Sequence, residues 1–176
     1  PLIIFDELTH FTKRMFIYLL SRNRSICGIK PYIRATCNPD PDSWVLELIQ
    51  WWINEDTGYP IPERDGKIRY FTIDKGEYIW GDTKEEVKEK ASYLFDKEEF
   101  KDINLDELIK SITFIHGTIY GNKKLLETNP SYLSNLMAQE DDEKLRLLEG
   151  NWKVRMDELC LFDYSSVNDI FTNYFD

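Results

Sequence analysis

Two adjacent acids, Asp6 and Glu7, close a short apolar run near the start of the sequence. The run, Leu2–Phe5, has the composition of a buried strand, so its carboxyl end delivers two carboxylates to one edge of a sheet. Ligands bind at that edge of open parallel sheets, and adjacent acids repel there unless a cation or proton lies between them. The first acid of such a pair can hold the water shell of a magnesium ion, and the second can polarise an attacking water. Ordinary helix capping is the alternative, because acids are common in the first turn of a helix.

A second polar group ends the next predicted strand, Tyr32–Cys37. Thr36 and Asn38 carry a hydroxyl and an amide that can hydrogen-bond a phosphate or its attacking water. A turn is the alternative here, because the run Asn-Pro-Asp-Pro from residue 38 is a strong loop signal by itself. In this order, the two motifs have the arrangement of a Walker B element followed by a phosphate sensor in a motor ATPase.

One predicted helix joins these two strands. It is capped by Thr9 and runs to about Ser21, and a turn at Gly28–Pro31 leads to the second strand. Two apolar strands that bracket one amphipathic helix predict adjacent, parallel strands in a mixed α/β fold. A further helix, capped by Ser43, is predicted to run to about Trp52.

The middle of the chain predicts a small subdomain made of a β-hairpin and helices. Residues 67–73 and 77–80 alternate in strand fashion about Asp74-Lys75-Gly76, which predicts a hairpin. The remaining predicted elements are a helix Lys84–Phe95 capped by Thr83, a short helix Leu105–Lys110, a strand Ser111–Ile119, a helix from Asn129-Pro130, and a helix Asp141–Leu148 that Gly150 ends.

The length and composition of the chain are consistent with one compact domain with a hydrophobic core. The chain has 176 residues, of which 42% are hydrophobic, and no apolar run approaches the ~18 residues that span a bilayer. Its three cysteines, Cys27, Cys37 and Cys160, are odd in number and far apart, which suits a reducing compartment and gives no zinc pattern. His10 and His116 have no metal-ligand partner at helical spacing.

The charge is acidic overall but unevenly distributed. The net charge is -10, whereas a freestanding nucleic-acid binder is usually basic. Between Phe11 and Ala35, however, there is no acid, and the basic residues there are Lys13, Arg14, Arg22, Arg24, Lys30 and Arg34. This stretch is either a solvated helix face followed by a loop or a patch that faces an anion.

Several runs of the sequence resemble one known family. IIFDELTHF, YLLSRNRS and RATCNPDPDSWV are similar to the ATPase domain of the large terminase subunit of tailed bacteriophages. GYPIPERDGKIRYF, EYIWGD, SITFIHGTIYGNKKLLETNPSYLSNL and LRLLEGNW resemble the same family in the same order, up to about Asn173. The resemblance implies a partial P-loop ATPase sheet of the ASCE type, with flanking helices. It also implies part of the motor that couples ATP hydrolysis to DNA translocation into procapsids, with Mg²⁺ and ATP as cofactors of the complete protein.

The resemblance assigns roles by position. Asp6 matches the Walker B acid that holds magnesium through water, and Glu7 matches the catalytic glutamate. The segment that matches the family's coupling motif comprises Thr36, Cys37 and Asn38. Cys37 departs from the Gly or Ala expected at its position, although it is still compact.

The resemblance also implies partners and surroundings. These are double-stranded DNA, the portal protein, the small terminase subunit, a possible homo-oligomeric ring, no membrane, and the cytoplasm of the bacterial host. Arg22 and Arg24 are candidates for an arginine that acts in trans on a neighbouring site, with ordinary surface arginines as the alternative.

One expected motif is absent from the sequence. No stretch reads as a glycine-rich loop followed by Lys and Ser or Thr, and Gly28 and Gly66 stand in other contexts. We therefore expect residues 1–152 to be the C-terminal half of a terminase ATPase domain, without its Walker A part. Residues 153–176 would be a linker or tail leading toward a nuclease domain that this chain lacks. The chain alone is then expected to be inactive.

Two other interpretations remain open at this point. The chain could be a nonenzymatic interaction or regulatory remnant that lost its nucleotide loop, and nucleotide affinity would separate this case from the first. It could also be an unrelated α/β enzyme that uses Asp6 and Glu7 with a metal, which metal-dependent activity without ATP would favour.

Overall fold

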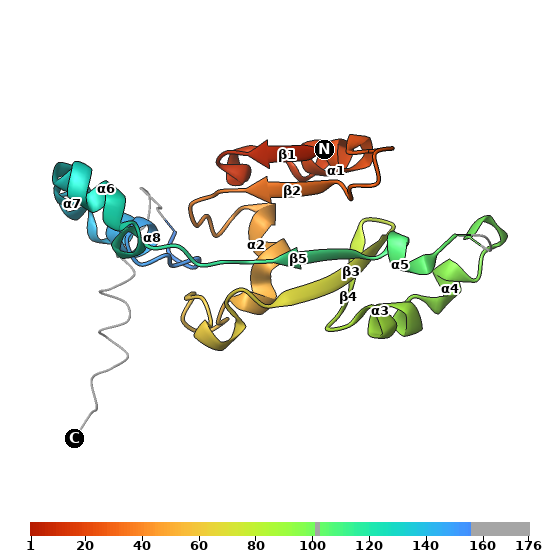
Figure 1. The fold of residues 1–176 in the computed structure, drawn as a ribbon. Helices are drawn as coiled ribbons and strands as arrows, with labels where there is room; N and C mark the ends of the chain where they lie inside the picture. Colours follow the sequence, from red (N-terminus) through yellow and green to blue (C-terminus); the bar gives the residue numbers. More distant parts are fainter. Residues whose placement is uncertain (101–102, 156–176) are drawn as a thin grey trace, which may run out of the picture. The chain divides into compact units, whose positions relative to one another are not determined.

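The computed structural model describes residues 1–100 and 103–155 of the chain (Figure 1). They form two compact units, one from Pro1–Ile61 with the described residues from Gly117 onward, and one from Pro62–His116. Within the described residues, no helix is long and apolar enough to cross a membrane. The predicted linker or tail lies outside the described residues from residue 156 on, as does Cys160.

The first unit is built on two parallel strands. β1 (Leu2–Phe5) pairs with β2 (Tyr32–Ala35) in a register that runs from Leu2↔Tyr32 to Phe5↔Ala35. The arrows of both strands point the same way in Figure 1, which confirms the predicted parallel pair. β2 ends two residues before the predicted Cys37, because its partner strand ends at Phe5 and the ladder has nothing further to pair with.

One face of this small sheet is open. Leu2 and Ile4 expose 42% and 66% of their surfaces, whereas Phe5 exposes only 3%. The apolar run Leu2–Phe5 predicted a buried strand, and that expectation is wrong for the face that carries Leu2 and Ile4. Along a strand alternate side chains point to opposite faces, so only one of the two faces is covered here.

The helix between the strands begins later than predicted. α1 (Lys13–Arg22) is capped by Thr12, whose hydroxyl oxygen accepts a hydrogen bond from the Met15 N–H at 3.2 Å. Thr9, the predicted cap, lies instead in the 3-10 turn Leu8–His10. The Leu8 N–H donates to the Thr36 carbonyl at 2.8 Å, so the chain is still attached to the neighbouring strand end there and the helix starts only afterwards.

Aromatic and aliphatic side chains pack this unit together. The Phe5 ring lies 5.1 Å from that of Phe11 and 5.7 Å from that of Phe16, and Phe16 lies 5.1 Å from Trp44. α2 (Trp44–Ile49) begins at the predicted cap, Ser43, and contributes buried side chains to the core. The other elements of the unit are the 3-10 turns Gln50–Trp52 and Ile119–Gly121 and the helices α6 (Lys123–Thr128), α7 (Pro130–Met137) and α8 (Asp141–Leu147).

Hydrogen bonds connect the segment after α8 to the loop that follows α2 and its 3-10 turn. The Asn151 side chain is buried, donates to the Thr57 carbonyl at 3.0 Å, and accepts from the N–H groups of Lys153 and Val154. The Trp152 N–H donates to the Gly58 carbonyl at 2.8 Å. Gly58 has φ of +77°, and a Cβ there would lie 2.6 Å from Asn151 Oδ1, so both its backbone angle and its neighbours require a glycine.

The second unit holds the predicted hairpin. β3 (Ile68–Asp74) pairs antiparallel with β4 (Glu77–Gly81) and, on its other side, with β5 (Lys110–Thr113), so the strand order is β4-β3-β5. The strand predicted at Ser111–Ile119 is shorter because its ladder ends at Ile68↔Thr113, where β3 begins.

Helices cover this antiparallel sheet. The predicted helix Lys84–Phe95 is divided at Ala91 into α3 (Lys84–Lys90) and α4 (Ser92–Phe95), and the predicted helix from Leu105 ends early as α5 (Leu105–Leu108). The 3-10 turns Pro62–Arg64 and Glu98–Phe100 complete the unit. Its core consists of Val87, Ala91, Leu94, Phe95 and Ile109.

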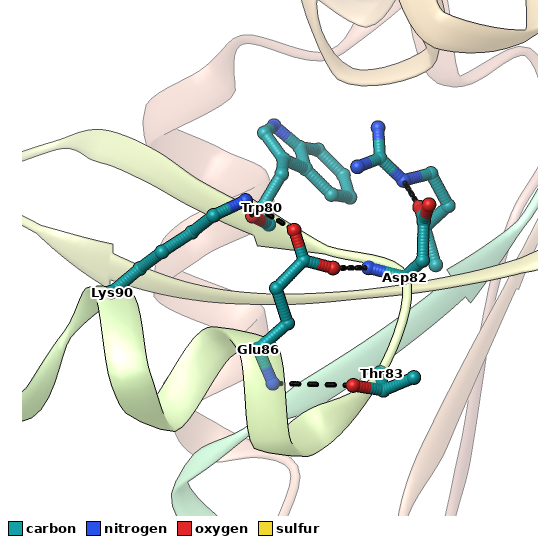
Figure 2. Close-up of polar contacts among 6 residues, drawn as sticks. Trp80, Asp82, Thr83, Glu86 and Lys90 are labelled. Carbon is teal, nitrogen blue, oxygen red and sulfur yellow. Dashed lines mark hydrogen bonds and ion pairs between the residues drawn. The ribbon is translucent and has the colours of Figure 1, made fainter.

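Figure 2 shows how the end of β4 is joined to α3. Thr83 caps the helix by accepting a hydrogen bond from the Glu86 N–H at 3.1 Å, and Glu86 accepts one from the Asp82 N–H at 2.7 Å. Lys90 donates to Glu86 at 2.5 Å and to the Trp80 carbonyl at 3.0 Å. The Lys90 hydrogen bond, followed by the Asp82 N–H, lowers the pKa of Glu86. These contacts stabilise the junction between β4 and α3.

Candidate functional site

The predicted site residues meet at the carboxyl edge of the parallel pair. Asp6 and Glu7 follow β1, and Thr36, Cys37 and Asn38 follow β2. Because the two strands are parallel, both segments leave the sheet at the same edge. Hydrogen bonds join the two segments.

Thr36 links to both acids through one hydroxyl. Its Oγ1 donates to Asp6 Oδ1 at 2.7 Å and accepts from the Glu7 N–H at 3.3 Å. Its backbone takes part as well, since the Thr36 N–H donates to the Phe5 carbonyl at 3.0 Å and its carbonyl accepts from the Leu8 N–H at 2.8 Å. Thr36 therefore holds the chain on both sides of the acidic pair.

Asn38 holds the carboxylate of Glu7. The Asn38 side-chain amide donates to Glu7 Oε1 at 3.3 Å and to Oε2 at 3.4 Å, and its backbone N–H donates to Oε2 at 3.3 Å. Glu7 is half-buried, whereas Asp6 and Asn38 are exposed. The Glu7 carboxylate is thus oriented by its neighbour yet still reachable from solvent.

The backbone of Glu7 is in a conformation that side chains rarely adopt. Its φ and ψ are 56° and 63°, in the left-handed region. Among the described residues, Lys75 in the β3–β4 turn is the other non-glycine residue with positive φ. Such a conformation costs about 1–2 kcal/mol for an L-residue, and strained residues of this kind concentrate at functional sites.

Cys37 is a protected thiol within the site. Burial raises its pKa to about 11, and the nearby Glu7 carboxylate adds to the effect. The thiol therefore stays protonated at neutral pH, and it is unsuited to act as a nucleophile.

The acids could accompany a magnesium ion but could not enclose one. No group of three or more His, Cys, Asp or Glu residues that could hold a metal occurs in the described part of the chain. Magnesium usually keeps several waters and takes one or two carboxylates together with substrate phosphates. Asp6 fits that donor set, because Thr36 binds only its Oδ1 and the carboxylate is exposed.

Arg22 and Arg24 lie away from this edge. α1 returns along the strands, and the Asn23 side chain between the two arginines donates to the Tyr32 carbonyl at 3.1 Å. Tyr32 begins β2, so the arginines lie at the amino edge of the pair and the acids at the carboxyl edge. If either arginine acts in catalysis, it does so on another molecule's site.

Two features of the site could not be predicted from the sequence. The left-handed conformation of Glu7 was not predicted, because glycine or asparagine is the usual marker of positive φ. The double role of the Thr36 hydroxyl depends on the register of β1 against β2, which sequence spacing alone does not define.

Comparison with known protein families identifies a family that covers most of the chain. A family model described as terminase large subunit, T4likevirus-type, N-terminal matches residues 1–168. No curated protein and no solved structure matches the chain.

Proposed function

The chain belongs to the T4-like type of the large terminase subunit family, whose role is phage DNA packaging, and from that premise we propose that Asp6 and Glu7 serve ATP hydrolysis in the packaging motor. The observation that carries the proposal is the hydrogen-bonded meeting of both acids with Thr36 and Asn38 at one edge of a parallel pair. The family assignment also argues against an unrelated metal-dependent enzyme.

Glu7 is the general base of this proposal. A base must be oriented toward the water that it activates, and two donors of Asn38 fix the Glu7 carboxylate while leaving it accessible. Asp6 would accompany Mg²⁺ through bound water, and the ion would neutralise charge on the phosphates of ATP. The Thr36 hydroxyl orients the Asp6 carboxylate for this task.

The segment 36–38 is suited to couple hydrolysis to movement. It binds both acids and leads through the Asp40 carbonyl, which accepts from the Ser43 N–H at 3.2 Å, into the cap of α2. A shift of either acid would therefore be transmitted to α2, whose buried side chains contribute to the core of the unit. This path supports the assignment of Thr36, Cys37 and Asn38 to the coupling motif.

ATP binding would need phosphate-holding groups beyond those in the sequence. Backbone amides of a glycine-rich loop and its lysine hold the phosphates in P-loop enzymes, and these 176 residues contain no such motif. Holding the reacting groups in the right geometry can lower a reaction barrier by about 7–11 kcal/mol. We therefore expect negligible ATP turnover by the chain alone and turnover where such a loop completes the P-loop fold.

The family role also suggests partners. Double-stranded DNA, the portal protein, the small terminase subunit and further copies of the subunit in a ring remain expectations, as does the cytoplasm of the bacterial host. In a ring, Arg22 or Arg24 would be available to a neighbouring site, because both are exposed and lie at the edge away from Asp6.

The test is DNA-stimulated phosphate release by the complete large subunit that carries this sequence. Glu7→Gln should abolish turnover while nucleotide binding is retained, since the amide keeps the shape of the base without its basicity. Glu89→Gln is the matched control, because Glu89 is an exposed acid on α3 and should tolerate the change. Wild-type turnover in Glu7→Gln would refute the assignment of the base. Loss of turnover in both variants would show a charge effect that is not specific to Glu7.

A further inference from the structure

One side of α1 is open to solvent and carries arginines beside apolar side chains. This open face consists of Arg14, Met15, Tyr18 and Arg22. All four lie within about 100° around the helix axis, because each residue of an α-helix turns the chain by about 100°. The exposed fraction of Met15 is 53% and that of Tyr18 is 57%. The opposite side of the helix packs inward through Phe16, whose ring lies 5.7 Å from that of Phe5.

The arginines of the open face have no acidic partner in the described part of the chain. Neither Arg14 nor Arg22 forms an ion pair with a carboxylate there. The Arg22 guanidinium lies 5.2 Å from the centroid of the Tyr18 ring, which restricts the side chain while leaving its N–H groups open to an acceptor. A segment that covers this face must therefore combine carboxylates with apolar side chains.

Residues 156–176 have that composition. They contain five acids and no Lys, Arg or His. The acids are Asp157, Glu158, Asp163, Asp169 and Asp176. Aromatic residues stand between them, among which are Phe162, Phe171 and Tyr174. Carboxylates pair with guanidinium groups through two parallel hydrogen bonds, and aromatic rings make favourable contacts with the sulfur of methionine. The sequence of this segment thus complements the open face of α1 in both charge and polarity.

The described chain ends beside the amino end of α1. Arg155 pairs at 3.0 Å with Asp42, which comes just before α2. On α2, the indole of Trp44 donates at 2.6 Å to the carbonyl of Phe11, two residues before α1 begins. A helix of ten residues is about 15 Å long, whereas 21 residues extend to about 70 Å. Residues 156–176 can therefore reach every turn of α1.

The open face of the parallel pair is a competing surface for the same segment. Leu2, Ile4 and Tyr32 are exposed there, and Arg34 is the basic residue that the two strands add to it. The Arg34 guanidinium lies 5.8 Å from the centroid of the Tyr32 ring. A single arginine matches five acids less well than the two arginines of α1 do, so the charges favour α1.

We propose that residues 156–176 bind the open face of α1 within the same chain. Their carboxylates would pair with Arg14 and Arg22, and their aromatic side chains would cover Met15 and Tyr18. The bound segment would compete with a neighbouring molecule for Arg22 and would thereby control access to one of the candidate trans-acting arginines. The proposal concerns the surface of α1 and does not depend on the roles of the acidic pair.

The test is hydroxyl-radical footprinting of the 176-residue chain, with the labelling of each side chain followed by peptide mass. Met137 and Tyr120 are internal references, because their exposed fractions of 59% and 56% match those of Met15 and Tyr18. Tethering gives the segment a local concentration on the order of 1 mM, so an intrinsic Kd of about 0.1 mM would keep it bound about nine-tenths of the time. Met15 and Tyr18 should then be labelled roughly tenfold more slowly than their references.

Variants on both sides of the contact should remove this protection. The tail variant carries Asp157→Asn, Glu158→Gln, Asp163→Asn and Asp169→Asn, and it should label Met15 as fast as Met137. The helix variant Arg14→Gln, Arg22→Gln should behave in the same way. Lys123→Gln, Lys124→Gln is the matched control, because it removes the same charge from exposed lysines on α6 and should leave the protection in place. Salt at about 0.5 M should weaken the protection, since it screens the charge pairs.

Several outcomes would overturn the proposal. Equal labelling of Met15 and Met137 in the wild-type chain would show that the open face stays uncovered. Protection that survives in the tail variant would show that the acids do not make the contact. Slower labelling of Met137 than of Met15 would place the segment on α7 instead. Protection that is lost when the protein is diluted tenfold would assign the open face to a second copy of the chain. None of these measurements uses ATP, so failure here leaves the roles of Asp6 and Glu7 to their own test.

Discussion

Removing the Thr36 hydroxyl should loosen the acidic pair without removing either acid. Thr36→Val keeps the size and β-branching of the side chain, and it deletes both the donor to Asp6 Oδ1 and the acceptor for the Glu7 N–H. The Thr36 backbone contacts to Phe5 and Leu8 stay in place. The change therefore tests the hydroxyl alone.

The expected loss follows from the two hydrogen bonds. A bond to a charged group contributes about 1.5–3 kcal/mol and a neutral one about 0.5–1.5 kcal/mol, and the 3.3 Å bond from the Glu7 N–H belongs at the low end. Asp6 and Thr36 are exposed, so in the variant water can hydrogen-bond the groups that lose the hydroxyl, which reduces the loss of free energy from both bonds. We expect the free energy of unfolding to fall by roughly 1–2 kcal/mol. Thr36→Ser, which keeps the hydroxyl, should lose less.

The assay combines urea unfolding with amide hydrogen exchange. Exchange at Glu7, whose N–H donates to the hydroxyl, should accelerate in Thr36→Val, while exchange at Leu8, whose N–H donates to the Thr36 carbonyl, should change little. Thr113→Val is the control, because Thr113 is exposed on β5. Equal stabilities of Thr36→Val and wild type, or unchanged exchange at Glu7, would refute the reasoning.

Three other predictions concern burial, backbone geometry and capping. The pKa of Cys37 is about 11 in the folded chain against an ordinary value of 9.0. The stability that the buried, protonated thiol contributes is therefore complete below pH 9 and is lost as the pH rises to 11. Cys37→Ala should remove that part of the pH dependence of the free energy of unfolding, measured by urea unfolding at several pH values. Gly58→Ala should lower the melting temperature through a loss of about 2–4 kcal/mol, because φ is +77° and Asn151 Oδ1 is 2.6 Å from the new Cβ; a variant as stable as wild type would contradict this. Thr83→Ala should cost about 1 kcal/mol by removing the cap of α3, and Thr83→Ser, measured alongside it, should not.

Sequence patterns were most informative where one local rule decided the structure. The parallel pair followed from two apolar runs around one amphipathic helix, and the hairpin followed from alternation about a turn. The caps at Ser43 and Thr83 were likewise predicted, since each hydroxyl precedes its helix directly. The family role was predicted from the order of its runs and is supported by the family match.

Prediction failed where distant contacts overrule local preference. Thr9 is as good a cap as Thr12, but the contact of Leu8 with the Thr36 carbonyl keeps the chain at the sheet until the later threonine. An apolar run also cannot distinguish a strand buried on one face from one buried on both, so the exposure of Ile4 was not foreseen. α6 was not predicted either, because its short sequence lacks a clear apolar period.

The left-handed conformation of Glu7 is stabilised by contacts with the neighbouring strand end. Its conformation costs about 1–2 kcal/mol, and nothing in the local sequence compensates for that cost. The hydrogen bonds of the Glu7 and Leu8 N–H groups to Thr36 are each worth about 0.5–1.5 kcal/mol, which is enough to offset it. The geometry of the proposed base is therefore imposed by the neighbouring strand end. A displacement of Thr36 would release Glu7 from this conformation, so the residues assigned to coupling would control the position of the base.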